Sequence, residues 1–227
     1  MKFTFYGHAC FAVEVSGKKL LFDPFITGNE LAKEIDINII EADYILVSHG
    51  HGDHVGDLMA IAQRTGATVI SNVEITDWVA KQGHEKVHPM NFGSREFDFG
   101  KVHFVPAQHS SGLPDGSYGG NPAGFVVKSE EINFYYSGDT CVMMDMQLIP
   151  WYAPIDVAIL PIGGNFTMDA EEAVIASDFV QCDRVIGIHF DTFGYIKIDH
   201  EKATAIFEKV DKELILPKIG ESFDISA

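Results

Sequence analysis

Residues 48–57, SHGHGDHVGD, hold three histidines and two aspartates with glycines between them. The segment directly follows the apolar run ADYILV, so these polar side chains stand at the end of a predicted strand. Residues two apart in an extended backbone point the same way, and His49 and His51 can therefore converge on one ion. Asp53 and His54 follow at the start of a predicted helix, where their side chains face a second candidate position for an ion.

The chemistry of this pattern is that of a metal site. Imidazole nitrogens together with carboxylate oxygens suit Zn²⁺, Fe²⁺, Mn²⁺, Co²⁺ or Ni²⁺, and the absence of a cysteine argues against a closed structural zinc site. A single histidine at a strand end is more often a hydrogen-bonded or surface residue. Metal-competent groups crowded as H-x-H-x-D-H would be costly neighbours without an ion to pair them, so the whole pattern predicts metal binding.

Three further metal-capable residues stand at the ends of other predicted strands. His109 follows a strand in VHFVPAQHSSG, Asp139 follows one in FYYSGDTC, and His189 ends one in RVIGIHFDTFG. Taken singly, they are typical of an ordinary loop histidine, an aspartate turn and a satisfied core histidine. Their order along the chain and their similar settings favour a common site.

Apolar periodicity predicts the elements that would position these residues. Strands are expected near 2–6, 10–16, 19–23, 44–48, 67–71, 95–99, 102–106, 124–128, 132–137, 156–160, 184–189 and 213–216. Helical patterns occur in HVGDLMAIAQRTG, VEITDWVAKQG, TMDAEEAVIASDFVQ (capped by Thr167 or Asp169) and IDHEKATAIFEKVDKE. Early hairpins followed by alternating strands and helices favour two sheets flanked by helices, in one domain spanning residues 1–227.

The composition of the chain argues against several classes of function. The formal net charge is −17 and the 16 Lys and Arg residues are scattered, so we expect no nucleic-acid partner. No run approaches the roughly 18 apolar residues of a membrane span, and the amino-terminal segment alternates like a strand rather than resembling a signal peptide. Three cysteines without CxxC spacing favour a reduced, cytoplasmic compartment. The oligomeric state stays open, a homo-oligomer included.

The ordered motifs resemble those of the metallo-β-lactamase-fold hydrolases. Within that superfamily, YGHACF, LLFDPFITGN, LPIGGNFTMDAEEA and IHFDTF make nearly the whole chain similar to the small metal-dependent hydrolases grouped with ascorbate-6-phosphate lactonase. The resemblance implies an α/β fold, a four-layer αββα sandwich of two mixed β-sheets flanked by helices, with the site at their shared edge. The metal motif is specific for the superfamily and says little about the substrate.

The resemblance also implies two divalent metal ions, Zn²⁺ foremost, with Mn²⁺, Fe²⁺, Ni²⁺ or Co²⁺ as alternatives. Two such ions lower the pKa of a shared water, and the resulting hydroxide would cleave an ester, lactone or phosphoester bond of a small metabolite. The alternatives are a phosphodiesterase acting on nucleic acid or lipid and an inactive metal-binding protein. The implied ligands are His49, His51 and His109 for one ion, Asp53, His54 and His189 for the other, and Asp139 bridging both.

Catalytic roles are expected for two residues. Asp53 would also guide the proton of the nucleophile as a general base. His8, at the end of the first strand, would act as a general acid or contact the substrate, and a hydrogen-bonded turn histidine is the alternative.

Neighbouring motifs suggest substrate contacts and supporting residues. Asn165 and Thr167 would contact the substrate beside backbone N–H groups that receive an anion, unless Thr167 merely caps a helix. Asp23 would tie down a loop or support a metal-binding histidine, and Cys141 is expected to be a small buried residue. The glycine-rich segment 112–124 is either a mobile loop over the pocket or a long hairpin connection.

Overall fold

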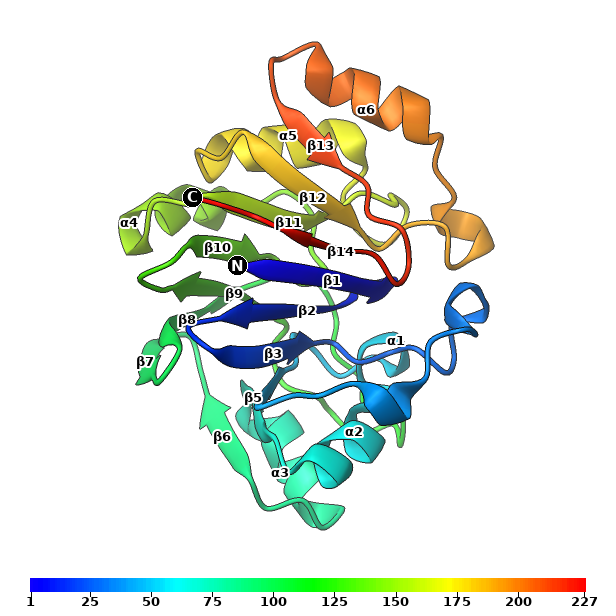
Figure 1. The fold of residues 1–227 in the computed structure, drawn as a ribbon, viewed down its shortest axis with the longest axis vertical. Coiled ribbons are helices and arrows are strands. Elements are labelled where there is room, and N and C mark those ends of the chain that lie inside the picture. The colour runs from blue at the N-terminus through cyan, green and yellow to red at the C-terminus, as the bar shows by residue number, and fades with distance from the viewer.

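The strands of the protein form two sheets of seven, described by a computed structural model of residues 1–227 (Figure 1). The first sheet has the order β14 (Ser222–Asp224), β1 (Lys2–Gly7), β2 (Cys10–Val15), β3 (Lys18–Phe22), β4 (Tyr44–Leu46), β5 (Thr68–Asn72), β6 (Val87–Met90). The second sheet has the order β13 (Glu213–Ile215), β12 (Arg184–Ile188), β11 (Val157–Pro161), β10 (Asn133–Tyr136), β9 (Ala123–Lys128), β8 (Gly100–Pro106), β7 (Ser94–Phe97).

Both sheets are mixed. In the first, β14, β1, β2 and β3 pair antiparallel, whereas β3, β4, β5 and β6 run parallel. In the second, β7 to β10 pair antiparallel and β10 to β13 run parallel. Parallel neighbours end at the same edge of their sheet, which matters because His49, Asp139 and His189 follow such strands.

Helices cover the outer face of each sheet (Figure 1). The helices are α1 (Gly52–Val55), α2 (Leu58–Thr65), α3 (Val73–Lys81), α4 (Ile149–Tyr152), α5 (Ala170–Phe179) and α6 (His200–Glu208). Short 3₁₀ helices span Glu30–Ala32, Ile37–Ile39, Met144–Leu148 and Gly194–Ile196. Buried side chains of α2 and α3 pack in one cluster with the first sheet, and those of α5 and α6 in another with the second. The predicted αββα sandwich is therefore confirmed.

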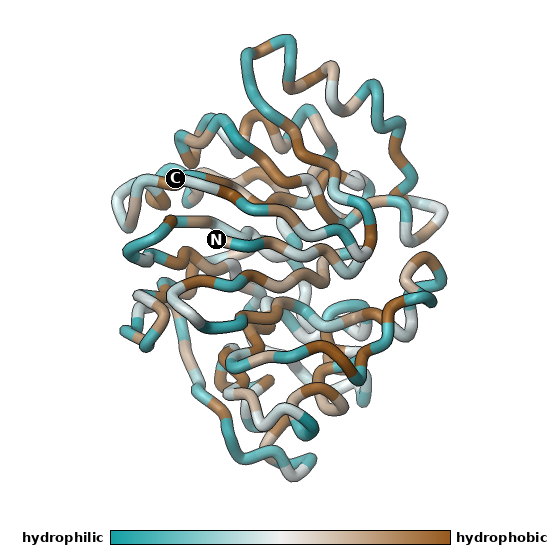
Figure 2. Tube along the Cα trace, viewed as in Figure 1, coloured by the Kyte–Doolittle hydropathy of each residue, from teal (hydrophilic) through white to brown (hydrophobic).

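A core of 25 buried residues lies between the two sheets. The rings of Phe3, Phe11 and Phe22 stack in turn, with centroids 5.2 and 4.6 Å apart, and Tyr136 of the second sheet meets the Phe22 ring edge-on at 5.6 Å. Figure 2 shows hydrophobic residues concentrated along the strands. The strand β11 is buried at every residue because helices cover the face that points away from this core.

Local sequence signals explain the helix ends. Asp169 caps α5 and forms a reciprocal capping box with Glu172, so Thr167 is not the cap. Gly66 ends α2 in the left-handed conformation, with a φ of 66°. The strands β6 and β14 were not predicted from the apolar pattern. Both are short edge strands, and β6 contains a proline, which only an edge position tolerates well.

The two sheets meet at the edge where β4 and β10 end. The N–H of Ala123, at the start of β9, donates to the carbonyl oxygen of Ser48, just beyond β4. Since β9 is antiparallel to β10, its start lies beside the end of β10, where Asp139 follows. The fold thus brings the candidate ligands of the two sheets to one edge. None of the helices combines the length and apolarity needed to cross a bilayer.

The aromatic stack between the sheets should dominate stability. Replacing the fully buried Phe22 by alanine should lower the free energy of unfolding by about 3–5 kcal/mol, because both the transfer of the ring and the cavity left behind contribute. Trp151→Ala is the matched control: this aromatic side chain is 86% exposed, and its loss should change stability by about 0.5 kcal/mol at most. Urea denaturation measures the free energy of unfolding of both variants. An equal loss of stability in Phe22→Ala and Trp151→Ala would contradict the packing described.

Candidate metal centre

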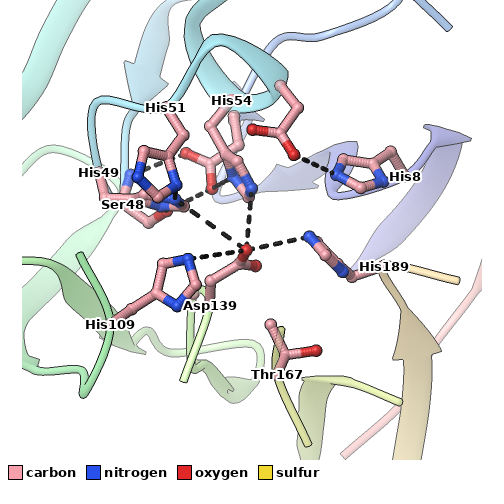
Figure 3. A network of polar contacts seen from close by, with 12 residues as sticks. His8, Ser48, His49, His51, His54, His109, Asp139, Thr167 and His189 are labelled. Atoms are coloured by element: carbon pink, nitrogen blue, oxygen red, sulfur yellow. Dashed lines mark hydrogen bonds and ion pairs between the residues drawn. The ribbon is translucent and has the colours of Figure 1, made fainter. Parts of the chain in front are cut away.

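The Asp139 carboxylate lies among four imidazoles (Figure 3). Its Oδ2 atom is 2.9 Å from His189 Nε2 and 3.3 Å from His54 Nε2. On the other side, Oδ2 is 3.7 Å from His109 Nε2 and 4.0 Å from His49 Nε2. The carboxylate therefore stands between histidines that come from three separate parts of the chain.

Two groups of side chains flank Asp139, each with ligand-capable atoms within 4.8 Å of one another. The first cluster consists of His49, His51 and His109; the second cluster consists of His8, Asp53, His54 and His189. Within the first, His49 Nε2 is 3.0 Å from His51 Nδ1. The structure thus brings together all seven residues expected as ligands, and it adds His8 to the second cluster.

Unpaired buried atoms show that the cluster fits a cation. His54 Nε2, both ring nitrogens of His189 and Asp139 Oδ1 are buried without a hydrogen-bond partner. The close approaches of His54 and His189 to Asp139 lack hydrogen-bond geometry, although they are short. Such orphaned groups are costly, and a divalent ion with nitrogen and oxygen ligands would satisfy one nitrogen of each ring together with the carboxylate.

Burial adjusts the protonation of these groups. Burial, with His54 nearby, lowers the pKa of His49 well below its usual value, and burial also lowers the pKa of His51 and His109. The imidazoles of the first cluster are therefore neutral at pH 7, as metal ligands must be. Burial alone would raise the pKa of Asp139, but His189 and His54 outweigh it and hold that pKa well below its usual range.

The ligand-bearing loops have backbone features that place their side chains. Just past β4, His51 begins α1, and its carbonyl oxygen accepts the N–H of His54 at 2.9 Å. Gly138 precedes Asp139 with a φ of 62°, and a Cβ there would lie only 2.5 Å from the carbonyl oxygen of Ala123. That Cβ would also lie 3.0 Å from the Cβ of Ser48, just past β4 of the first sheet, so glycine at 138 permits this turn to pack closely against both β9 and the first sheet.

Asp23 supports ligands of both clusters through hydrogen bonds on the Nδ1 side of their rings. Its Oδ2 accepts hydrogen bonds from His54 Nδ1 at 2.8 Å, from the Ser48 hydroxyl and from the Tyr136 hydroxyl. The Ser48 hydroxyl also lies 3.0 Å from His49 Nδ1. Because Asp23 engages the Nδ1 atom of His54, it leaves Nε2 directed at Asp139. Asp23 has contacts of both expected kinds: its Oδ1 accepts the N–H of Ser48 at 2.7 Å and so ties down the loop after β4, and its Oδ2 supports a candidate metal-binding histidine.

Sequence reasoning missed several polar residues that support the site. Ser110 Oγ is 3.2 Å from His51 Nε2, and Ser111 Oγ accepts the N–H of Gly50 at 3.0 Å. Thr192 Oγ1 is 3.0 Å from His8 Nδ1. Their adjacency to the candidate ligands in HSSG and HFDTF was the only available signal.

The expected substrate contacts lie at different depths. Thr167 is 8% exposed and belongs to a loop that meets the turn after Asp139, because the N–H of Met168 donates to the carbonyl oxygen of Thr140 at 3.1 Å, whereas Asn165 is exposed at the surface. The N–H groups of Phe166 and Thr167 donate to the carbonyl oxygen of Gly164, so they are not free to receive an anion.

Two neighbouring features differ from the expected alternatives. Cys141 is exposed and its thiol donates to Gln108 Oε1 at 3.1 Å, so the expectation of a buried residue was wrong. Segment 112–124 is fastened at its base, because Asn72 Nδ2 donates to the carbonyl oxygens of Gly119 and Asn121. A connection tied to the first sheet in this way is favoured over a mobile lid.

Asp23→Asn should weaken metal binding without removing a candidate ligand. An amide has one oxygen and cannot accept all the hydrogen bonds that the carboxylate of Asp23 receives, so the ring of His54 loses its support. Metal affinity should fall about 10–100-fold, as measured by titration with Zn²⁺. Asp98→Asn is the control, since Asp98 bonds Tyr44 and Lys18 at the surface. Unchanged affinity in Asp23→Asn would contradict the supporting role.

Known proteins share this fold and most of this sequence. The family profile of the beta-lactamase superfamily domain matches residues 18–190. A UPF0173 metal-dependent hydrolase of Flavobacterium johnsoniae is 57% identical over 99% of this chain and 100% of its own length. A relative with the same description from Methylacidiphilum infernorum is 51% identical over 98% of this chain and 99% of its own.

Solved structures of other proteins have the same fold. Igni18, a metallo hydrolase from the archaeon Ignicoccus hospitalis, has a TM-score of 0.88 at 32% identity, covering 99% of each chain. An isothiocyanate hydrolase from Delia radicum gut bacteria has a TM-score of 0.81 at 17% identity, covering 100% of each chain, and shares the fold. With relatives matched end to end and a profile that spans all seven expected ligands, this chain belongs to the beta-lactamase superfamily, among its UPF0173 metal-dependent hydrolases.

Proposed function

We propose that the protein holds two divalent ions, one in each cluster, and hydrolyses an ester, lactone or phosphoester bond of a small molecule. The observation that carries this proposal is the position of the Asp139 carboxylate between the clusters, 2.9 Å from His189 Nε2 and 3.7 Å from His109 Nε2. A carboxylate so placed can be shared by two ions. The nitrogen and oxygen donors suit Zn²⁺ and also Mn²⁺, Fe²⁺, Co²⁺ and Ni²⁺.

When bound, the pair of ions supplies Lewis acidity and lowers the pKa of a shared water towards neutrality. We assign to Asp53 the role of the general base that accepts the proton of that water. Burial alone would raise the pKa of Asp53, but the hydrogen bond from His8 and the nearby charges of His54 and His8 together outweigh it and hold that pKa below its usual range. Asp53 is thus ionised at pH 7, and its side chain is 27% exposed, compared with 3% for Asp139. It is therefore better placed than Asp139 to exchange a proton with water.

Two loops border the second cluster and supply the proposed substrate contacts. Loop 163–168 carries Asn165 and Thr167, and loop 190–196 follows His189; a Cβ at Gly163 would lie 2.2 Å from the carbonyl oxygen of His189, so the loops touch. Both loops also carry exposed aromatic rings, Phe166, Phe193 and Tyr195. Aromatic rings beside polar groups are typical of pockets for small, partly apolar molecules.

The substrate is proposed to be a small molecule rather than a nucleic acid. A formal net charge of −17 repels a polyanion, and the chain offers no basic cluster to offset that repulsion. Neutral esters and lactones meet no such barrier. The acidic surface therefore favours small, weakly charged substrates.

Asp139→Ala should abolish metal binding and hydrolysis together, because the shared carboxylate is lost. The assay is turnover of a panel of lactones, carboxylic esters and phosphodiesters, with and without a chelator, alongside metal analysis of the purified protein. His88→Ala, on the edge strand β6, is the matched control and should keep its metal and its activity. Turnover that persists after chelation, or full activity of Asp139→Ala, would refute the proposal.

Thr167→Val should raise KM while leaving metal content unchanged, since it removes only a hydroxyl from the loop that meets the turn after Asp139. An increase of about tenfold would correspond to one lost hydrogen bond of about 1.4 kcal/mol. Thr4→Val, in β1 away from the cluster, provides the comparison and should keep the original KM. If both variants behave alike, Thr167 has no part in substrate binding.

A further inference from the structure

We propose that His8 is the positioning residue of the second cluster, joining Asp53 of one sheet to the His189 loop of the other. The inference rests on the proposed dinuclear site, because Asp53 and His189 are the ligands that it would align. His8 itself follows β1 and lies outside the H-x-H-x-D-H motif.

The His8 ring is fully engaged by protein atoms. It is 1% exposed, with Nε2 3.2 Å from Asp53 Oδ2 and Nδ1 3.0 Å from Thr192 Oγ1. The rings of Phe25 and Phe193 stand edge-on to it, with centroids 5.6 and 5.3 Å away. A ring enclosed in this way is poorly placed to protonate a leaving group or contact a substrate, so the contacts favour a positioning role over both.

The backbone of His8 makes a second connection to the same cluster. Its carbonyl oxygen accepts the N–H of His189 at 2.8 Å, and the two rings lie with centroids 4.0 Å apart. Both residues are left-handed, with φ of 56° and 57°. Such strain in residues other than glycine persists only where the surrounding structure demands it. Main chain and side chain of His8 thus fix two candidate ligands that the sequence places far apart.

The hydrogen-bond directions explain how His8 would orient Asp53. A neutral imidazole has a single N–H. If Nε2–H donates to Asp53 Oδ2, then Nδ1 accepts from the Thr192 hydroxyl, whose other acceptor, the carbonyl oxygen of Phe190, is more distant at 3.4 Å. Oδ2 is thereby occupied, and Oδ1 of Asp53 is left for the ion. Thr192 would fix the tautomer of His8, and His8 would orient the carboxylate of Asp53. That carboxylate would in turn position the ion.

Two substitutions of His8 separate this role from a general structural one. The amide nitrogen of Gln approximates the position of Nε2, whereas that of Asn approximates Nδ1 and cannot reach Asp53. Asn also adopts the left-handed conformation readily, so His8→Asn removes the contact to Asp53 with little added backbone strain. His8→Gln keeps a donor for Asp53. His88→Ala, a histidine on the edge strand β6, serves as the control.

The affinity for each ion is measured by titrating the metal-free protein with Co²⁺ and recording the visible absorption as each ion binds. The titration is repeated with Zn²⁺ and monitored by calorimetry. His8→Asn should bind the first ion as the unaltered protein does and the second about 10–100-fold more weakly. His8→Gln should restore the second affinity to within about tenfold, and Thr192→Val should weaken it several-fold. Circular dichroism checks that each variant is folded.

Each contrary result has a distinct meaning. Unchanged affinity for the second ion in His8→Asn, or equal loss of both ions, would overturn the positioning role while leaving the dinuclear site intact. Failure of His8→Gln to restore the second ion would overturn it in favour of direct ligation by His8. A single ion in the unaltered protein would instead refute the proposed dinuclear function, and this inference with it.

Discussion

The site depends on one carboxylate from the second sheet lying among histidines that come from both sheets. Asp139 reaches His49 and His54 only because β10 and β4 end at the same edge of the sandwich. A shift of one sheet over the other would separate them by several ångströms. The core between the sheets, with the Phe11 and Phe22 rings at its centre, therefore fixes the geometry of the metal centre as well as the stability of the fold.

Behind the candidate ligands lies a set of hydrogen bonds that orients them. Asp23 engages His54 directly and His49 through Ser48, and its bond from Tyr136 ties this arrangement to the second sheet. Buried polar groups are costly unless they are paired. The protein meets that requirement at the Nδ1 atoms of His54 and His49 and leaves Nε2 of His54 unpaired, which is the arrangement a metal ion needs.

Backbone strain is concentrated at the same place. Of the residues other than glycine with positive φ, His8, Asp23, Asn165, His189 and Asp191 all lie at the site or in the loops that border it. Each such conformation costs of the order of 1–3 kcal/mol and is retained where function or packing requires it. The compact core offsets this cost, so the site and the fold are energetically linked.

Signals within the chain were sufficient to predict most of the elements and the local part of the site. Strong apolar periodicity and caps such as Asp199 predicted α6 and the main strands, because those signals lie within a few residues of each other. The spacing in H-x-H-x-D-H predicted a metal site, since residues two apart share a face. Short edge strands such as Val87–Met90 were missed because they bury too few side chains to leave a pattern.

The contacts between residues far apart in the chain follow from the packing of the two sheets. Neither the left-handed turn at His8 nor its contacts with Asp53 and Thr192 has a local signature, because the partners are 45 and 184 residues away. The exposure of Cys141 likewise follows from the path of the loop after β10. Short-range physics selects the residue types and the elements of this protein, whereas the packing of the two sheets selects which of those residues become neighbours.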